Sequence, residues 1–295
     1  MSEQPRGMKT PRSRRWVLSR AAMVAAGVAV PSTWIASNAL ADPASPKLAE
    51  VDMELVLVAA LVDPPKPDMA PTDPCGPHVK LVETAMEAKK LLEGKNVDEH
   101  FGSATVQAYA KWQEELGYTG IDANGLPGKT TLTKLAEGQF TIVNEVAAGD
   151  RNDSYGGERT NTRTVEMLTK ADELFSAEIG LTQGSYTNSN PGSAGTHDGG
   201  GVIDIGVNSL GETERWELVK ALRTVGFAAW LRTPDQGFDY HIHAVGVADP
   251  DLSSSAQAQV HDYYVGKNGL ANHDADNTPD EYKVDFTWWE KYKRG

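Results

Sequence analysis

Residues 193–207 of the chain read SAGTHDGGGVIDIGV. The alternation in its second half is typical of a half-buried strand, with Ile203 and Ile205 on one face and Asp204 on the other. A carboxylate on a sheet face among apolar side chains requires a partner, because burying it unpaired is costly. The run of three glycines before the strand permits a tight turn. We expect this turn to bring His197 over the sheet beside Asp204.

A second chemical motif, DYHIH, occupies residues 239–243. On a strand that begins at Asp239, the side chains of Asp239, His241 and His243 point to the same face. Two imidazoles and one carboxylate are a known catalytic zinc set, in which the fourth position is left to water. The sequence therefore predicts a zinc site that joins His197 and its carboxylate partner to a histidine of this strand.

Together the two motifs resemble those of the zinc D-Ala-D-Ala peptidases, a family of carboxypeptidases and peptidoglycan endopeptidases. The family pattern is S-x-H-x-x-G-x-A-x-D, followed some tens of residues later by H-x-H, and the similarity covers about residues 159–251. The His, Gly and Asp of the first pattern fall on His197, Gly200 and Asp204. The resemblance implies that His197 and Asp204 bind zinc together with one histidine of the H-x-H motif, for which His243 is favoured over His241. It then gives His241 a supporting or transition-state role.

The general base is predicted from the same strand. The family has a carboxylate three residues before its last ligand, where this chain has Tyr240. Asp239 shares a strand face with both histidines, and we predict it as the base, with Asp198 as the second candidate. A purely structural interpretation instead pairs Asp204 with an arginine such as Arg232 and leaves the histidines hydrogen-bonded to the backbone.

Substrate contacts are predicted from the resemblance as well. The family motif S-G-Y-R, whose arginine binds the terminal carboxylate of the substrate, falls on residues 183–186, so that Tyr186 replaces the arginine. We expect Gln183, Tyr186 and Ser193 to contact the substrate. Without that guanidinium, cleavage inside a stem or cross-link peptide is favoured over removal of a terminal D-Ala, unless Arg163 supplies the missing charge.

Residues 79–138 predict a small bundle of three helices. Apolar residues recur at helical spacing after Leu81, a second helix follows Ser103 and ends at Gly117, and a third covers residues 128–135. The segment resembles the bacterial peptidoglycan-binding domain, which implies adhesion to the cell wall. The residues that carry this resemblance are Asp98, Phe101, Gly102, Thr105, Trp112, Gln113, Leu116, Gly117, Asp122, Gly128 and Thr131.

Residues 1–41 are typical of a secretory signal peptide. Paired arginines at 14 and 15 precede an apolar run over residues 21–30, and Ala39-Leu40-Ala41 offers a cleavage site. The arginine pair predicts export by the twin-arginine pathway. Pro31 ends the run before it reaches the roughly 20 residues that span a bilayer. We therefore expect a secreted, cell-wall-associated protein with no stable membrane span after the signal is removed.

The net charge of the chain limits the class of partner that it can bind. The net charge of −13 becomes −18 without residues 1–41, because these carry six Lys/Arg and one acidic residue. A chain this acidic has no electrostatic surface for nucleic acid.

Residues 42–78 predict a Pro-rich linker, and their apolar part at 55–62 is expected to dock on a neighbour as a strand or short helix.

Residues 146–295 alternate strand and helix patterns with long loops, which predicts an α+β domain with a mainly antiparallel sheet. From the two resemblances we expect a secreted zinc metallopeptidase, either a peptidoglycan endopeptidase or a D-Ala-D-Ala carboxypeptidase. Its helical domain would hold it to peptidoglycan while it hydrolyses stem or cross-link peptide bonds. The alternative is a non-catalytic peptidoglycan-binding protein whose peptidase-like domain is inactive.

Overall fold

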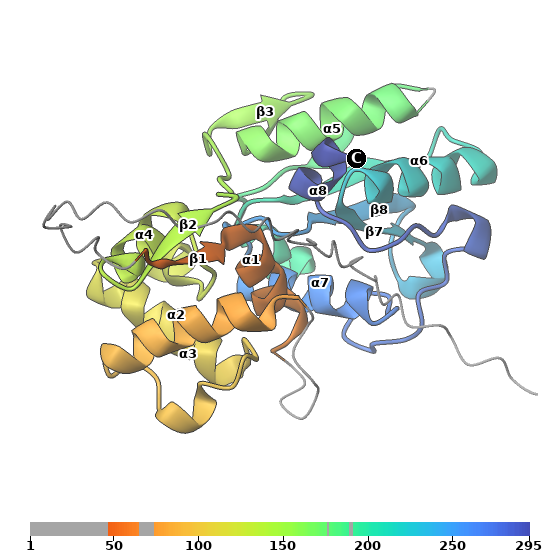
Figure 1. Cartoon of the computed structure of the whole chain (residues 1–295). Coiled ribbons are helices and arrows are strands. Elements are labelled where there is room, and N and C mark those ends of the chain that lie inside the picture. The colour runs from red at the N-terminus through yellow and green to blue at the C-terminus, as the bar shows by residue number, and fades with distance from the viewer. Residues whose placement is uncertain (1–46, 65–73, 176, 189–190) are drawn as a thin grey trace, which may run out of the picture.

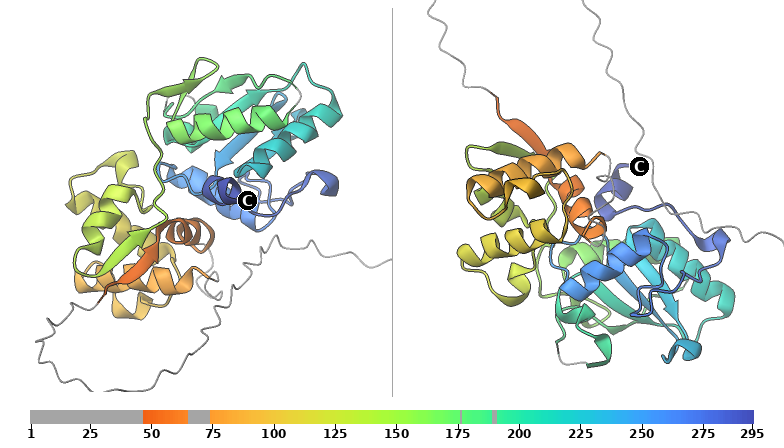
Figure 2. Two further views of the ribbon diagram at one scale, coloured as in Figure 1. Left: turned by 45° about the horizontal axis from the view of Figure 1, so that its top comes forward. Right: turned by 90° about the horizontal axis from the view of Figure 1, so that it is seen from below.

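A computed structural model describes residues 47–64, 74–175, 177–188 and 191–295 of the chain. The predicted signal peptide, residues 1–41, lies outside the described residues, as does the Pro-rich stretch 65–73. The fold mixes helices with small sheets, which confirms the α+β prediction. Figure 1 and Figure 2 show two lobes, a helical lobe coloured orange to lime and a sheet lobe coloured green to blue.

The elements follow one another from the N-terminal end of the described chain. The helices are α1 (Met53–Val62), α2 (Gly76–Ala88), α3 (Ser103–Glu115), α4 (Lys129–Ala136), α5 (Thr162–Leu174), α6 (Glu212–Thr224), α7 (Ser254–Tyr264) and α8 (Trp289–Arg294). The strands are β1 (Ala49–Asp52), β2 (Phe140–Val143), β3 (Asp153–Tyr155), β4 (Glu158–Thr160), β5 (Leu181–Gln183), β6 (Val202–Gly206), β7 (Phe227–Arg232) and β8 (His241–Gly246). None of the helices in the described part combines the length and apolarity that crossing a bilayer requires.

The helical lobe contains the three predicted helices, α2, α3 and α4, and a parallel pair of strands, β1 and β2. Two of the residues that carried the resemblance to the peptidoglycan-binding domain, Trp112 and Gln113, make buried hydrogen bonds within this lobe. The indole of Trp112 donates to the carbonyl of Thr131 (3.0 Å), and the amide of Gln113 donates to the carbonyl of Leu126 (2.9 Å). These bonds tie α3 to the loop before α4 and to α4 itself, so the motif specifies the fold of this lobe.

The segment predicted as a linker, residues 42–78, contains regular structure. It includes β1, all of α1 and the start of α2, so the expectation of a short docked helix at 55–62 is met by α1. Nine of the ten residues of α1 are buried, because its sequence is apolar on every side and must be covered on every side. Pro77 lies in the first turn of α2, where a missing N–H costs nothing.

Helix α1 lies in the seam between the lobes and packs on α7. Its buried Glu54 accepts a hydrogen bond from the indole of Trp288 (2.7 Å) and pairs with the guanidinium of Arg294 (2.6 Å). Figure 2 shows α8, at the C-terminal end, lying beside α1. One apolar core therefore continues from the helical lobe to the sheet lobe.

The sheet lobe is organised by four antiparallel strands in the order β5-β6-β8-β7. Its antiparallel pairing agrees with the sequence prediction. One face carries the isoleucines of β6 and β8 and is covered by α5 and α6. The opposite face carries Asp204, His243 and Trp230. Helix α7 covers part of this face, and Figure 1 shows α7 beside β7 and β8. The register places Asp204 directly across from His243, and His243 directly across from Trp230.

The helical lobe gives a pH-dependent prediction at Glu83. Burial raises the pKa of Glu83 to about 7 from its ordinary value of 4.5, although Thr105 and backbone N–H groups donate to the carboxylate. Between these two values the folded chain binds more protons at this position than the unfolded chain, so the free energy of unfolding falls as pH rises. We expect Glu83→Gln to remove this part of the slope, with a gain over wild type of about 1–3 kcal/mol above pH 7.

The measurement is chemical denaturation of both proteins at a series of pH values. Comparing the two curves cancels the titration of all other groups. A difference between variant and wild type that does not change with pH would contradict this assignment.

Candidate metal centre

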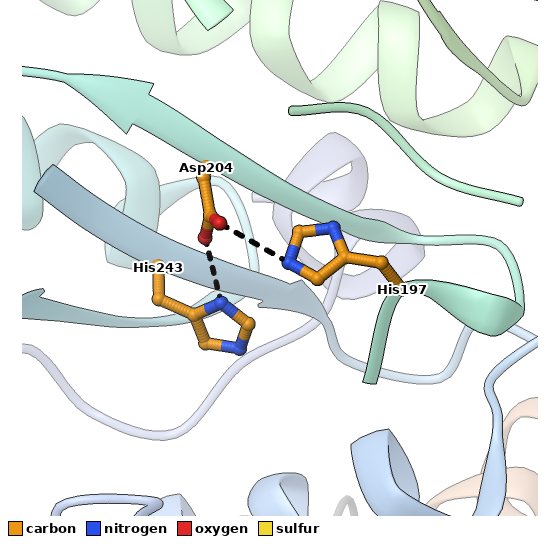
Figure 3. Close-up of side chains that lie close together, drawn as sticks. All are labelled: His197, Asp204 and His243. Carbon is orange, nitrogen blue, oxygen red and sulfur yellow. Dashed lines mark hydrogen bonds and ion pairs between the residues drawn. The ribbon is translucent and has the colours of Figure 1, made fainter. Parts of the chain in front are cut away.

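Three elements bring His197, Asp204 and His243 together, as Figure 3 shows. Asp204 and His243 are directly opposite each other on the paired strands β6 and β8. His197 lies on a single 3-10 turn, residues 196–198, which follows Gly195 in the left-handed region at φ 76°. The sequence prediction that His197 returns to Asp204 is therefore confirmed.

The glycines between His197 and β6 are required by close packing. A Cβ on Gly199 would lie 2.2 Å from the carbonyl oxygen of Asp251, and one on Gly200 would lie 2.5 Å from the hydroxyl of Tyr186. Gly201 has a φ of +72°, which side chains rarely allow. The loop is thus pressed against residues 249–253, and this contact supports the turn that carries His197.

The donor atoms converge on a small volume. Nε2 of His197 lies 3.3 Å from Oδ2 of Asp204, and Nδ1 of His243 lies 2.8 Å from Oδ1. The two imidazole rings are 5.3 Å apart between centroids, and one ligand atom from each of the three residues lies within 4.8 Å of the others. His197 is 1% exposed and His243 is 6% exposed, whereas the Asp204 side chain retains 17%. The group is able to bind a metal ion that approaches from the side of Asp204.

In each histidine, the outer ring nitrogen, which is the one that points away from Asp204, lies within hydrogen-bond distance of a protein oxygen atom. Nδ1 of His197 lies 2.8 Å from the carbonyl oxygen of Gly184. Because a carbonyl oxygen only accepts hydrogen bonds, Nδ1 must carry the proton. Nε2 of His243 lies 2.9 Å from Oε1 of Gln259, whose own NH₂ donates to the carbonyl of Gly269 (2.9 Å). In the neutral rings the inner nitrogens therefore carry lone pairs, and both face a carboxylate. Only a proton or a cation between them relieves the repulsion.

The electrostatics favour the cation. Burial lowers the pKa of His243, and its bond to Asp204 only partly opposes this shift, so the ring holds an extra proton weakly. Burial alone would raise the pKa of Asp204, but a hydrogen bond and a positive charge from His197 or His243, present when the nitrogen facing Asp204 is protonated, outweigh burial and lower the pKa, so that the carboxylate is ionised. Neutral imidazoles and an ionised carboxylate are the states that metal binding requires.

His241 lies at the edge of the group. Its Nε2 is 3.9 Å from Oδ1 of Asp204, its Nδ1 is 2.8 Å from the backbone carbonyl of Asp239, and its side chain is 21% exposed. Asp239 lies outside β8, which begins at His241. The prediction that Asp239 shares a strand face with the two histidines therefore does not apply. The side chains of Asp239 and Asp198 are exposed.

Two of the predicted substrate residues adjoin the group. Gln183 pairs with Asp204 across β5 and β6, and its amide donates to the hydroxyl of Ser193 (2.9 Å). Tyr186 has a different setting, because its hydroxyl donates to the carboxylate of Asp251 (2.7 Å). Arg163, the other candidate for a carboxylate contact, is 3% exposed and paired with Glu290 (2.7 Å). Neither Tyr186 nor Arg163 offers a free charge to a substrate.

Sequence reasoning missed Gln259 and Trp230, and it considered the buried Arg232 only as a structural partner of Asp204. The guanidinium of Arg232 lies over the ring of Trp230 (5.2 Å), and burial lowers its pKa to about 10, which leaves it charged at neutral pH. A signal for Gln259 was present, because it lies on the same side of α7 as Ala256 and Tyr263, which are buried against the sheet lobe. A polar residue in such a stripe indicates a buried partner.

Comparison with protein-family models, with curated proteins and with solved structures finds no match.

The geometry predicts one metal ion per chain. We expect the purified protein to hold about one zinc ion, and His197→Ala to lose most of it, because a direct ligand contributes more than the roughly 10–100-fold in affinity that a supporting hydrogen bond does. Elemental analysis after equilibration with zinc measures the ratio. His273→Ala is the matched control, since His273 is 63% exposed and paired with Asp262 away from the group. Equal zinc in His197→Ala and wild type would exclude this site.

Proposed function

We propose that the protein is a secreted zinc-dependent peptidase that hydrolyses stem or cross-link peptide bonds of peptidoglycan. The observation that carries the proposal is the paired orientation of His197 and His243. Their outer nitrogens are bonded to protein oxygens and their inner nitrogens face the ionised Asp204. The two sequence resemblances, one to zinc D-Ala-D-Ala peptidases and one to peptidoglycan-binding domains, support the choice of substrate.

Zinc is the metal that this donor set suits best. Two imidazole nitrogens and one carboxylate oxygen match catalytic zinc sites, in which a fourth position stays open. The chemistry that zinc supplies in such a set is polarisation of the scissile carbonyl and activation of water. The partial exposure of Asp204 and His241 supports access by substrate from that side.

Proton transfer is assigned to His241. Because its Nδ1–H donates to the carbonyl of Asp239, the neutral ring keeps a lone pair on Nε2, 3.9 Å from Asp204. In this assignment Nε2 takes a proton from the attacking water as its oxygen bonds to the carbonyl carbon. The same proton passes to the amide nitrogen when the C–N bond breaks. Asp239, predicted from sequence as the base, acts in this proposal through its backbone carbonyl.

The cleaved bond is proposed to be internal to a stem or cross-link peptide. A carboxypeptidase requires a positive group for the terminal carboxylate, and the two residues considered for it are engaged elsewhere: Tyr186 with Asp251 and Arg163 with Glu290. Gln183 and Ser193, beside Asp204, are proposed to bind the peptide backbone, which needs hydrogen bonds rather than charge. The helical lobe is proposed to raise the local concentration of the enzyme at the wall.

The second candidate is a non-catalytic peptidoglycan-binding protein. The exposed position of Asp239 before β8 favours it, since the family's carboxylate base then has no counterpart on the strand. The intact ligand group favours the peptidase.

Hydrolysis of purified muropeptides tests the peptidase. We expect the zinc-loaded protein to cleave cross-linked muropeptides with the addition of one water per cut, detected by mass spectrometry. His241→Ala is expected to lower the rate by about 10²–10⁴-fold at unchanged zinc content, and Asp239→Asn by only a few-fold. If Asp239→Asn loses as much as His241→Ala, the proton transfer belongs to Asp239. No cleavage by the loaded protein would leave the binding-only candidate.

Binding to the wall is separable from cleavage. We expect His197→Ala to co-sediment with purified sacculi as well as the wild type does, because His197 lies in the sheet lobe and adhesion is assigned to the helical lobe. If neither the wild type nor His197→Ala co-sediments with sacculi, peptidoglycan is not the partner.

A further inference from the structure

Three side chains around His243 donate to three consecutive backbone carbonyls. The indole of Trp230 donates to Lys267 (2.9 Å), the guanidinium of Arg232 to Asn268 (2.7 Å), and the amide of Gln259 to Gly269 (2.9 Å). Trp230 is stacked with the ring of His243, with centroids 6.3 Å apart and planes at 20°. Segment 267–269 therefore orders the side chains that surround His243.

Gly269 allows this segment to lie on the sheet. Its φ is +68°, and a Cβ there would lie 2.9 Å from Cη2 of Trp230. A larger residue would push the segment away from the tryptophan ring and move the carbonyl that Gln259 binds.

The two ends of the Gln259 amide are thus assigned. A carbonyl accepts only from N–H, so the NH₂ group faces Gly269 and Oε1 faces His243. Because Oε1 is an acceptor, Nε2 of His243 carries the proton and Nδ1 presents its lone pair to Asp204. A water molecule at Nε2 could either donate or accept and would leave both tautomers open.

We propose that Gln259 is a positioning residue that sets the tautomer of His243 and thereby prepares Nδ1 to bind metal, with the carbonyl of Gly269 setting the orientation of Gln259. This inference rests on the metal centre of the proposed function and does not depend on peptidase activity. Gln259 lies outside both sequence motifs, residues 193–207 and 239–243, and is identified by its contacts with His243 and Gly269.

Zinc affinity tests the proposal with three variants of α7. We expect Gln259→Leu to bind zinc about 10–100-fold more weakly in competition with a chromophoric chelator, because the ring loses its acceptor. Gln259→Glu is expected to bind zinc more tightly than Gln259→Leu but more weakly than wild type, since a carboxylate oxygen also accepts from Nε2 of His243 but the N–H donor to the carbonyl of Gly269 is lost. Gln257→Leu is the matched control and should bind as wild type, because the Gln257 amide donates to Asn124 and Leu252 rather than to His243.

The imidazole tautomer is measured independently by ¹⁵N NMR of the metal-free protein at a pH where the ring is neutral. We expect His243 to be protonated on Nε2 in the wild type and Gln259→Glu, and to populate both tautomers in Gln259→Leu. Equal affinity and the same tautomer in Gln259→Leu and wild type would overturn the proposal. If the wild type binds no zinc, the metal centre fails, and the tautomer spectra still decide whether Gln259 sets the ring.

Discussion

The antiparallel pairing of β6 with β8 is the constraint on which the site depends. It sets Asp204 directly across from His243, with the two side chains on the same face of the sheet. A slip of one residue would turn one of them into the apolar layer beneath α5 and α6. The register is held by that layer, because Ile203, Ile205 and Ile242 are almost fully buried there. Apolar packing on one face of the sheet therefore fixes the positions of Asp204 and His243 on the other face.

Much of this arrangement could be predicted from sequence because it depends on local period and spacing. Alternation at 202–207 identified β6 and its faces, and the glycine run identified the return of His197. The same reasoning failed for Asp239, because alternation was extended two residues beyond the start of β8. Gln259 escaped notice because its partner, His243, lies 16 residues away and meets it only after α7 packs on the sheet.

The segment around α1 shows a second limit of sequence reasoning. Prolines on both sides of a short apolar run predicted a linker with a docked element, yet the run forms the buried helix of the seam. Its stability depends on residues more than 200 positions away, Trp288 and Arg294, which pair with Glu54. No local pattern contains that information. A buried acid in an apolar helix was the one sign that a distant basic or N–H partner was required.

The turn that carries His197 is connected to the helical lobe by a series of contacts across the seam. The glycine loop before β6 is pressed against Asp251 and its neighbours, and the Asp251 carboxylate is held by two nitrogens of Arg151 and by Tyr186. Arg151 also pairs with Asp122 of the helical lobe. A chain of direct contacts therefore joins the lobe proposed to bind the wall to the turn that carries a metal ligand. The Arg151 and Asp122 side chains are each 39% exposed and that of Asp251 is 12% exposed, so the network is only partly buried. Its direct contacts nevertheless link the position of His197 to how the two lobes are seated.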